Sequence, residues 1–203
     1  MLYYTTNPTS PCRSTHHPRL PDKLQTKKIR IEDPDHDLQR SIPQTLNFNP
    51  FTRIGSDWML ITAGQPGDMN TMTASWGGAG VLWTKNVVTA YIRPQRYTKE
   101  FVDREDIFTL SFFDEKYRPA LKHLGTVSGR GRDKIAEAGL TPCAIEGSAA
   151  FEEANTVLVC KKMYVDAIKP ENFCKDCDPD TWYKEKDYHV MYIAEILKAF
   201  VKE

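Results

Sequence analysis

Residues 70–98 read NTMTASWGGAGVLWTKNVVTAYIRPQRYT, and this stretch decides the fold. Apolar and hydroxyl-bearing side chains alternate through residues 70–76, a period-two pattern that predicts a β-strand with one apolar face and one polar face. Residues 86–92 are rich in β-branched side chains and predict a second strand. The glycine-rich residues 77–85 are expected to interrupt the regular structure as a turn. The stretch therefore predicts two strands joined by an irregular connection.

The rest of the chain contains more predicted strands than helices. Helical spacing of apolar residues follows Pro94 and recurs between residues 117 and 125, and a third short helix is expected to end at Gly139. Mostly strand-to-strand connections favour an antiparallel barrel with helices at its margins over a doubly wound α/β sheet. The further segments with strand-like patterns are residues 58–63, 106–113, 156–165 and 189–197.

Composition limits the classes of function. The chain has 203 residues, with Lys plus Arg at 27 and Asp plus Glu at 27. Without a surplus of basic groups, nucleic acid is not expected as a partner. No apolar run is long enough to span a bilayer, so no membrane partner is expected either. The five cysteines are few, odd in number and scattered, which favours a reducing compartment, and we expect a cytoplasmic location.

The N-terminal residues 1–48 differ in composition from the rest. Seven of the thirteen prolines lie in the first 50 residues, and proline disfavours helices and central strands. We predict an irregular or disordered extension here, followed by one domain at residues 49–203. Six basic residues and one acid up to Arg30 also fit an organelle transit peptide, an alternative that stays open. Cys12 and the two nearby histidines lack the further rigid ligand that a metal site needs, and no metal site is predicted.

Common nucleotide and hydrolase motifs are absent from the sequence. It contains no G-x-G-x-x-G opening a helix, no P-loop, no G-x-S-x-G and no H-E-x-x-H. Cys174 and Cys177 form a single C-x-x-C pair in a loop with three aspartates. Redox-active pairs of this kind usually lie at a helix N-terminus beside an apolar βαβ pattern. We therefore interpret the pair as part of a surface loop.

A candidate anion site follows the second strand of residues 70–98. Arg93 and Arg96 flank a proline at a predicted helix start, where free backbone N–H groups and guanidinium groups can bind phosphate. Tyr97 and Thr98 add hydroxyl groups, and the basic loop at residues 128–134 adds positive charge. Each feature alone is more often a solvated surface group. Their occurrence together, with a hydroxyl-lined strand and a tryptophan, indicates a site for an anionic ligand.

Several motifs occur in a characteristic order: residues 70–78 (NTMTASWGG), 93–98 (RPQRYT), 128–134 (SGRGRDK), 139–142 (GLTP), and a histidine at 189 ahead of 192–196 (YIAEI). In this order and spacing they resemble the flavin reductase-like family, over about residues 49–202. The resemblance implies a mainly β, FMN-binding split β-barrel, antiparallel and of Greek-key type, with a few peripheral helices.

The resemblance also implies roles for individual residues. Residues lining the isoalloxazine ring would be Asn70, Met72, Thr73, Ala74, Ser75 and Trp76, with backbone groups bonding its polar edge. Residues holding the ribityl phosphate would be Arg93, Arg96, Tyr97 and Thr98. Residues closing over the phosphate or the ring from the other side would be Ser128, Gly129 and Lys134. His189 would be the catalytic residue, near the nicotinamide or the flavin edge.

The implied function is hydride transfer from NADH or NADPH to FMN, in a homodimer with the flavin near the subunit interface. FMN carries the redox chemistry itself, so the protein needs neither a nucleophile nor a metal. The same pocket suits an FMN-binding electron carrier of the flavoredoxin type that a partner redox protein reduces, and the sequence does not separate the two. A related split barrel that binds another phosphorylated ring, such as pyridoxal phosphate, is a third alternative.

Overall fold

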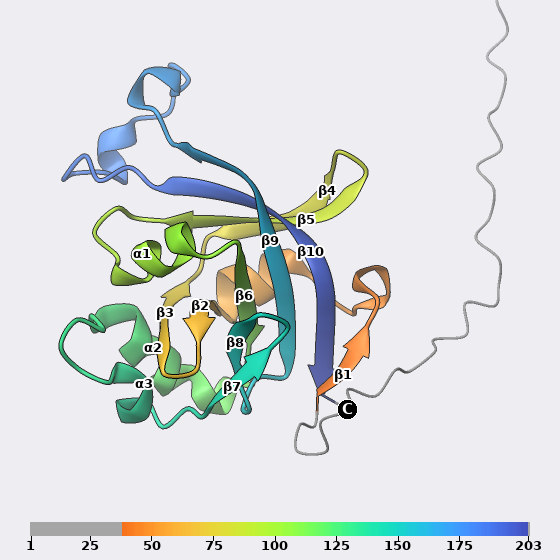
Figure 1. Ribbon diagram of the computed structural model, residues 1–203. Helices are drawn as coiled ribbons and strands as arrows, with labels where there is room; N and C mark the ends of the chain where they lie inside the picture. The colour runs from red at the N-terminus through yellow and green to blue at the C-terminus, as the bar shows by residue number, and fades with distance from the viewer. Residues whose placement is uncertain (1–37, 203) are drawn as a thin grey trace, which may run out of the picture.

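A computed structural model describes residues 38–202 of the chain (Figure 1). The interpretations that concern the transit peptide, Cys12 and the nearby histidines lie outside the described residues. The strands are β1 (Leu38–Ser41), β2 (Met59–Gln65), β3 (Asp68–Ala74), β4 (Gly77–Leu82), β5 (Lys85–Ile92), β6 (Ile107–Phe112), β7 (Pro142–Ile145), β8 (Ser148–Phe151), β9 (Thr156–Ala167) and β10 (Val190–Lys202). The α-helices are α1 (Tyr97–Arg104), α2 (Arg118–Thr126) and α3 (Lys134–Glu137).

One antiparallel sheet of eight strands dominates the fold. Its order is β3-β2-β6-β9-β10-β5-β4, and β1 pairs with β10 beside this path. The arrangement is not a simple meander, because β2 pairs with β6 and β5 pairs with β10. The mainly β, antiparallel class predicted from the sequence is confirmed. Within the described residues, no helix is long and apolar enough to cross a membrane.

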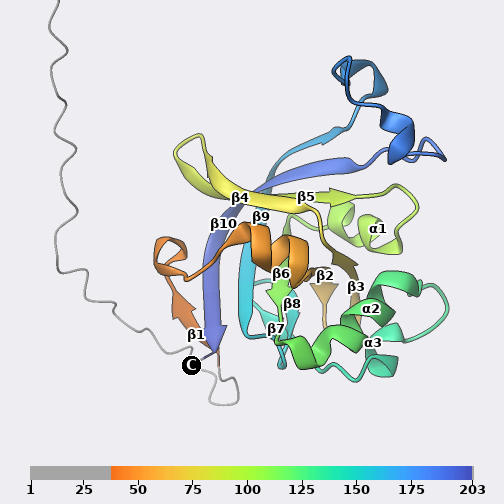
Figure 2. The same ribbon diagram turned by 180° about the vertical axis from the view of Figure 1, so that it is seen from behind.

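The sheet curls into a barrel that stays open between two strands that are consecutive in the chain. β3 and β4 are the two ends of the sheet, and only Ser75 and Trp76 separate them (Figure 2). Because β3 pairs only with β2, the backbone groups along its other edge have no strand partner in the described part of the chain. The opening stretch of sequence therefore forms both sides of the gap in the barrel.

Two apolar cores lie on opposite faces of the central strands. Met59 and Ile61 of β2 point into the barrel, whereas Leu60 between them packs against the outer layer of α2, α3 and the β7–β8 hairpin. β9 divides its side chains in the same way, with Leu158 inside and Val157 outside. This alternation follows from the two-residue period of a strand. Burial on both faces holds β2 rigidly, and β2 in turn positions β3.

The expected turn at residues 77–85 is wrong, because most of it is strand. β4 pairs with β5 from Gly77 to Leu82, and the two-residue hairpin turn is Trp83-Thr84, both with positive φ. A Cβ atom on Gly77 would lie 2.8 Å from the carbonyl oxygen of Thr89, so the glycine permits close approach between the strands. Two-residue turns with positive φ at both positions usually contain Asn or Gly. The sequence Trp83-Thr84 therefore did not predict a hairpin.

The prediction of an irregular segment up to residue 48 is wrong for its last part. β1 extends the sheet at its margin, and Leu38 is buried in the outer core. Leu46 and Phe48 pack against the inner core. Proline disfavours central strands, but β1 lies at the margin of the sheet and its four residues contain no proline. The β7–β8 hairpin was also not predicted, since each strand has only four residues.

Candidate functional site

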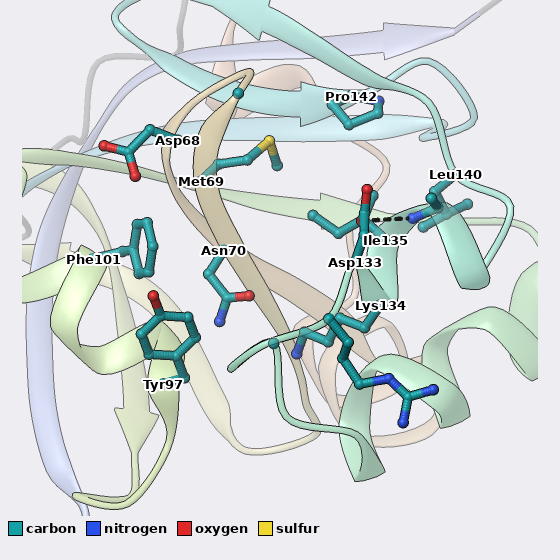
Figure 3. Close-up of a pocket in the computed structure, with 14 residues that line it drawn as sticks. Asp68, Met69, Asn70, Tyr97, Phe101, Asp133, Lys134, Ile135, Leu140 and Pro142 are labelled. Atoms are coloured by element: carbon teal, nitrogen blue, oxygen red, sulfur yellow. Dashed lines mark hydrogen bonds between the residues drawn. The ribbon is translucent and has the colours of Figure 1, made fainter.

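A cavity of about 420 Å³ opens beside the start of β3 (Figure 3). β3 contributes Asp68, Met69 and Asn70 to its lining, and α1 contributes Tyr97 and Phe101. The loop before α3 and the helix itself form the opposite wall. Four residues expected to hold the cofactor line this cavity, namely Asn70, Tyr97, Gly129 and Lys134.

Asn70 is the contact point of three segments at the cavity. Its Nδ2 donates a hydrogen bond of 2.9 Å to Oγ1 of Thr98, and both side chains are buried. Its Oδ1 lies against Gly129, where an added Cβ atom would come within 2.4 Å. A side chain at position 129 would therefore displace the Asn70 amide. The hydrogen bond joins β3 to α1, and the glycine lets the loop before α3 close onto both.

A buried lysine and a partly buried arginine lie next to each other behind this loop. Nζ of Lys134, which is 3% exposed, donates to the carbonyl oxygens of Leu124 and Val127 at 3.3 and 3.2 Å. Nη1 of Arg96 donates to the carbonyl oxygen of Gly125 at 2.7 Å. Burial, and next the charge of Arg96, lower the pKa of Lys134 to about 8. Burial also lowers the pKa of Arg96.

The acceptors of this cation pair are neutral carbonyl groups at the end of α2. Within the described residues, neither Lys134 nor Arg96 has a carboxylate in ion-pair contact. The two acids that line the cavity are engaged elsewhere: Asp68 pairs with Arg104, and Asp133 accepts a hydrogen bond from the backbone N–H of Ala136. In the described part of the chain, Lys134 therefore lacks a carboxylate in ion-pair contact, although the carboxylate of Asp133 lines the same cavity.

The two other arginines of the loop are paired. Arg130 forms an ion pair with Glu100 and stacks on the ring of Tyr97, with 4.3 Å from Cζ to the ring centroid. Arg132 makes two hydrogen bonds to Glu137, at 2.9 and 2.8 Å. These contacts hold the loop against α1 and α3. They leave Lys134 and Arg96 as the cations available to an anion.

A second, more apolar cavity of about 450 Å³ lies beyond the far end of β3. Ser75 and Trp76 line it together with Tyr91, Tyr183 and Phe51. Asn70 in β3 lines the first cavity, and Ser75 and Trp76, which directly follow β3, line the second. The free edge of β3 runs between them.

His189 lies in an aromatic cluster beside this second cavity. Its ring centroid is 5.1 Å from that of Trp76 and 6.5 Å from that of Tyr91. Its Nδ1 is 3.0 Å from the hydroxyl of Tyr183. Burial, followed by the charge of Arg93, lowers the pKa of His189 to about 4, while Asp187 acts in the opposite direction. The imidazole is therefore neutral at pH 7.

Arg93 contacts residues of the His189 cluster. None of the contacts described below joins it to Lys134 or Arg96. It forms an ion pair with Asp187, and its Nη2 donates to the carbonyl oxygen of Trp182 at 3.0 Å. Its guanidinium also lies over the ring of Tyr183, at 5.4 Å from the centroid. Arg93 thus fastens the long β9–β10 connection, which extends away from the barrel (Figure 1).

The other expected ligands have contacts within the fold. Met72 and Ala74 are buried in the inner core. Thr73 donates to the carbonyl oxygen of Leu121 at 2.5 Å, so the hydroxyl-bearing face of β3 packs against α2. Ser128 is exposed, and its Oγ accepts from the backbone N–H of Arg130 at 3.2 Å. For these residues, only backbone groups or an exposed hydroxyl remain for a ligand.

Sequence reasoning did not identify Tyr183 or Asp187. Tyr183 lies six residues before His189, and their contact depends on the path of an irregular connection, which no local pattern predicts. The pairing of Asp187 with Arg93 joins residues 94 positions apart. Phe101 was recognised only as part of a helix. The surface-loop interpretation of Cys174 and Cys177 is confirmed, since both side chains are exposed.

Comparisons with known proteins agree with this architecture. The family described as "Flavin reductase like domain" matches residues 51–203. A search of curated proteins found no match.

Solved structures share the fold at low sequence identity. A Shewanella frigidimarina protein described with a split barrel domain superposes with a TM-score of 0.58 at 15% identity, covering 76% of this chain and 72% of that one. Flavoredoxin of Desulfovibrio vulgaris gives 0.57 at 21% identity, covering 80% and 78%. The NADH:FAD oxidoreductase of Streptomyces globisporus gives 0.52 at 15% identity, covering 70% and 74%. The match over residues 51–203 shows that the chain belongs to the flavin reductase-like family, and its fold is that of the split-barrel structures.

Proposed function

We propose that the protein is an oxidoreductase that binds FMN along β3 and reduces it with a hydride from NADH or NADPH. The phosphate lies against Lys134 and Arg96, and the isoalloxazine lies toward Trp76. FMN has an anionic phosphate and a planar aromatic ring joined by a flexible ribityl chain. That arrangement suits a cavity lined by Lys134 and a more aromatic cavity at the other end of the free edge of β3.

The observation that carries the proposal is that buried Lys134, beside partly buried Arg96, has no carboxylate in ion-pair contact among the described residues. Burying a charged group away from water is costly unless it is paired, and the lowered pKa of Lys134 reflects that cost. A phosphate would supply the missing charge and accept charge-assisted hydrogen bonds. The Asn70–Thr98 hydrogen bond and the close approach of Gly129 fix the wall next to these cations. A site arranged in this way suits a phosphorylated ligand.

The free edge of β3 supports the placement of the ring. The isoalloxazine has a pyrimidine edge with carbonyl and N–H groups, which match the unpaired donors and acceptors of an edge strand. Met72 and Ala74 then act through their backbone, since their side chains are in the core. Trp76, 42% exposed, gives an aromatic wall at the end of the strand. His189 lies beside Trp76 and meets the ring or the hydride donor.

Bound FMN supplies the two-electron redox chemistry, and the chain supplies binding and orientation. Neutral His189 provides a hydrogen-bonding group without adding charge next to the ring. The open side of the second cavity gives a nicotinamide access. The similarity to an NADH:FAD oxidoreductase supports reduced nicotinamide as the donor.

Anaerobic reduction tests this proposal. The full chain is mixed with FMN and then with NADH or NADPH, and the flavin band near 450 nm is followed. We expect the band to bleach with either nicotinamide in the presence of the protein, faster than without it. FMN that is bound but not reduced by either nicotinamide would rule out the hydride-transfer step.

A second candidate is an FMN-binding electron carrier. The similarity to a flavoredoxin favours it, and so do the exposed ring of Trp76 beside His189 and the exposed ring of Trp182 next to Trp76, because an electron-transfer partner needs close access to the flavin. This function predicts slow reduction by nicotinamides and fast reduction by a small redox protein. Stopped-flow rates with both kinds of donor separate the two functions.

A homodimer in the cytoplasm is part of the same proposal. β4 is an edge strand, and Val81 and Trp83 at its hairpin are 74% and 59% exposed. An exposed apolar edge of this kind favours association with a second copy. Sedimentation of the purified chain tests the dimer: a mass near 23 kDa at micromolar concentration would contradict it.

A further inference from the structure

The hydrogen bond between Tyr183 and His189 lies in a nearly closed pocket of the β9–β10 connection. Tyr183 is 4% exposed and His189 is 7% exposed, and the two polar atoms are 3.0 Å apart. Phe173 and Tyr188 pack on the Tyr183 ring, with centroids at 6.3 and 4.8 Å. Arg93 covers it from another side. The hydroxyl of Tyr183 therefore has a fixed position.

The surroundings of the hydroxyl decide which of the two groups donates. Burial raises the pKa of Tyr183, so the phenol keeps its proton at neutral pH, although the charge of Arg93 opposes the shift. The nearest acceptor is Nδ1 of the neutral His189 ring. In this arrangement Nδ1 carries no proton and Nε2 carries one.

Burial, and next the charge of Arg93, keeps the ring of His189 neutral. Arg93 disfavours the imidazolium, and Asp187 favours it, but Asp187 is already paired with Arg93 and with Gln95. Tyr183 and Tyr91 are the other titratable groups that face the ring, and burial raises the pKa of Tyr183. Within the described residues, Nε2 of His189 has no hydrogen-bond partner. It remains free for a ligand.

We propose that Tyr183 is a positioning residue that holds His189 as the Nε2-protonated tautomer, and so makes it a fixed hydrogen-bond donor to a carbonyl or ring-nitrogen acceptor of a bound ligand. As a group that donates a hydrogen bond without giving up its proton, His189 orients the acceptor and leaves no charge behind. The role of His189 toward a ligand rests on the proposed function. The tautomer itself is expected in the protein without any ligand.

Nuclear magnetic resonance of the ligand-free full chain, labelled with ¹⁵N in histidine, tests the tautomer directly. In the unaltered protein, we expect His189 to have a protonated Nε2 and a bare Nδ1, unchanged down to about pH 5, given its pKa of about 4. In Tyr183→Phe, we expect a mixture of tautomers and a shift of the titration toward the ordinary histidine value of about 6.5. Tyr188→Phe is the matched control, because its ring packs in the same cluster but its hydroxyl has no hydrogen bond among the described residues.

Two results would overturn the proposal. One is a protonated Nδ1 of His189 in the unaltered protein. The other is a Tyr183→Phe variant whose His189 spectrum and titration match those of Tyr188→Phe. Because both readouts use protein without flavin, they can fail while FMN binding holds. Conversely, loss of the proposed hydride transfer would leave the tautomer assignment unaffected.

Discussion

The amide of Asn70 donates a 2.9 Å hydrogen bond to the hydroxyl of Thr98, and this contact closes the start of β3 against the first turn of α1. Both groups are buried beside the candidate phosphate cavity. The same Asn70 side chain touches Gly129 through its other amide atom. A single polar side chain thus fixes the relative positions of the three segments that form the wall.

Thr98→Val removes this acceptor while keeping the side-chain shape. We expect the free energy of unfolding to fall by about 1–3 kcal/mol, because the Asn70 amide loses its partner in a buried site. FMN affinity should also fall, since the Asn70 amide is no longer held. Thr109→Val is the control: it removes a buried hydroxyl that donates to Ala149 at 2.7 Å, away from the cavity. Urea unfolding and FMN titration of both variants measure the effects, and equal FMN affinities in the two would contradict the assignment.

Lys134→Met removes one of the two cations without counter-ions. We expect FMN affinity to drop by roughly 10- to 100-fold, because a charge-assisted hydrogen bond contributes about 1.5–3 kcal/mol. Lys162→Met is the matched control, because Nζ of Lys162 also donates to two carbonyl groups, Val102 and Asp103, but outside the cavity. Fluorescence titration with FMN gives both affinities. A similar loss in the two variants would indicate a general structural effect.

The lowered pKa of Lys134 also predicts a pH dependence of stability. Its pKa is 10.5 in an ordinary environment and about 8 in the folded protein, so between these values the unfolded chain holds a proton that the folded chain has lost. Stability therefore rises with pH across this window, by roughly 3 kcal/mol for this group in the absence of an anion. Lys134→Met lacks the contribution. Unfolding free energies of both proteins at pH 7.5 to 10 measure it, and parallel curves would contradict the shifted pKa.

Arg93 and Arg96 are expected to differ in their effects, although both fit a phosphate site by sequence. Arg96 lies beside Lys134, whereas Arg93 is paired with Asp187 in the His189 cluster. Arg96→Met should weaken FMN binding by roughly 10-fold or more. Arg93→Met should leave FMN affinity within about twofold and instead disturb the β9–β10 connection, seen as faster proteolysis there. If Arg93→Met weakened FMN binding more than Arg96→Met, the phosphate would have to be assigned to Arg93 instead.

Patterns within single strands carried most of what the sequence predicted correctly. The alternation at residues 70–76 and the β-branched run at 86–92 correspond to β3 and β5, because side-chain period and β-propensity are local properties. β4 was missed, since its glycines pair with β5 through a close backbone approach that no local pattern reports. β1 was missed because its neighbour β10 is about 160 residues away.

At the site, too, residues within local motifs were predicted, whereas contacts between distant parts of the chain were not. Asn70, Tyr97, Gly129 and Lys134 were expected at one site from their motifs and do line one cavity. The contacts of Arg93 and His189 with Asp187 and Tyr183 depend on how an irregular connection of about 20 residues folds back on the barrel. Pairings of this kind arise from tertiary packing, so neither spacing nor composition indicated them.

Binding of FMN and of riboflavin, measured side by side, tests the central claim most directly. Riboflavin has the same ring and ribityl chain but lacks the phosphate. We expect the full chain to bind FMN at least 10-fold more tightly than riboflavin, and Lys134→Met to abolish most of that difference while riboflavin affinity stays unchanged. Equal affinities for the two flavins in the unaltered protein, or an unchanged ratio in Lys134→Met, would contradict a phosphate held by Lys134 and Arg96.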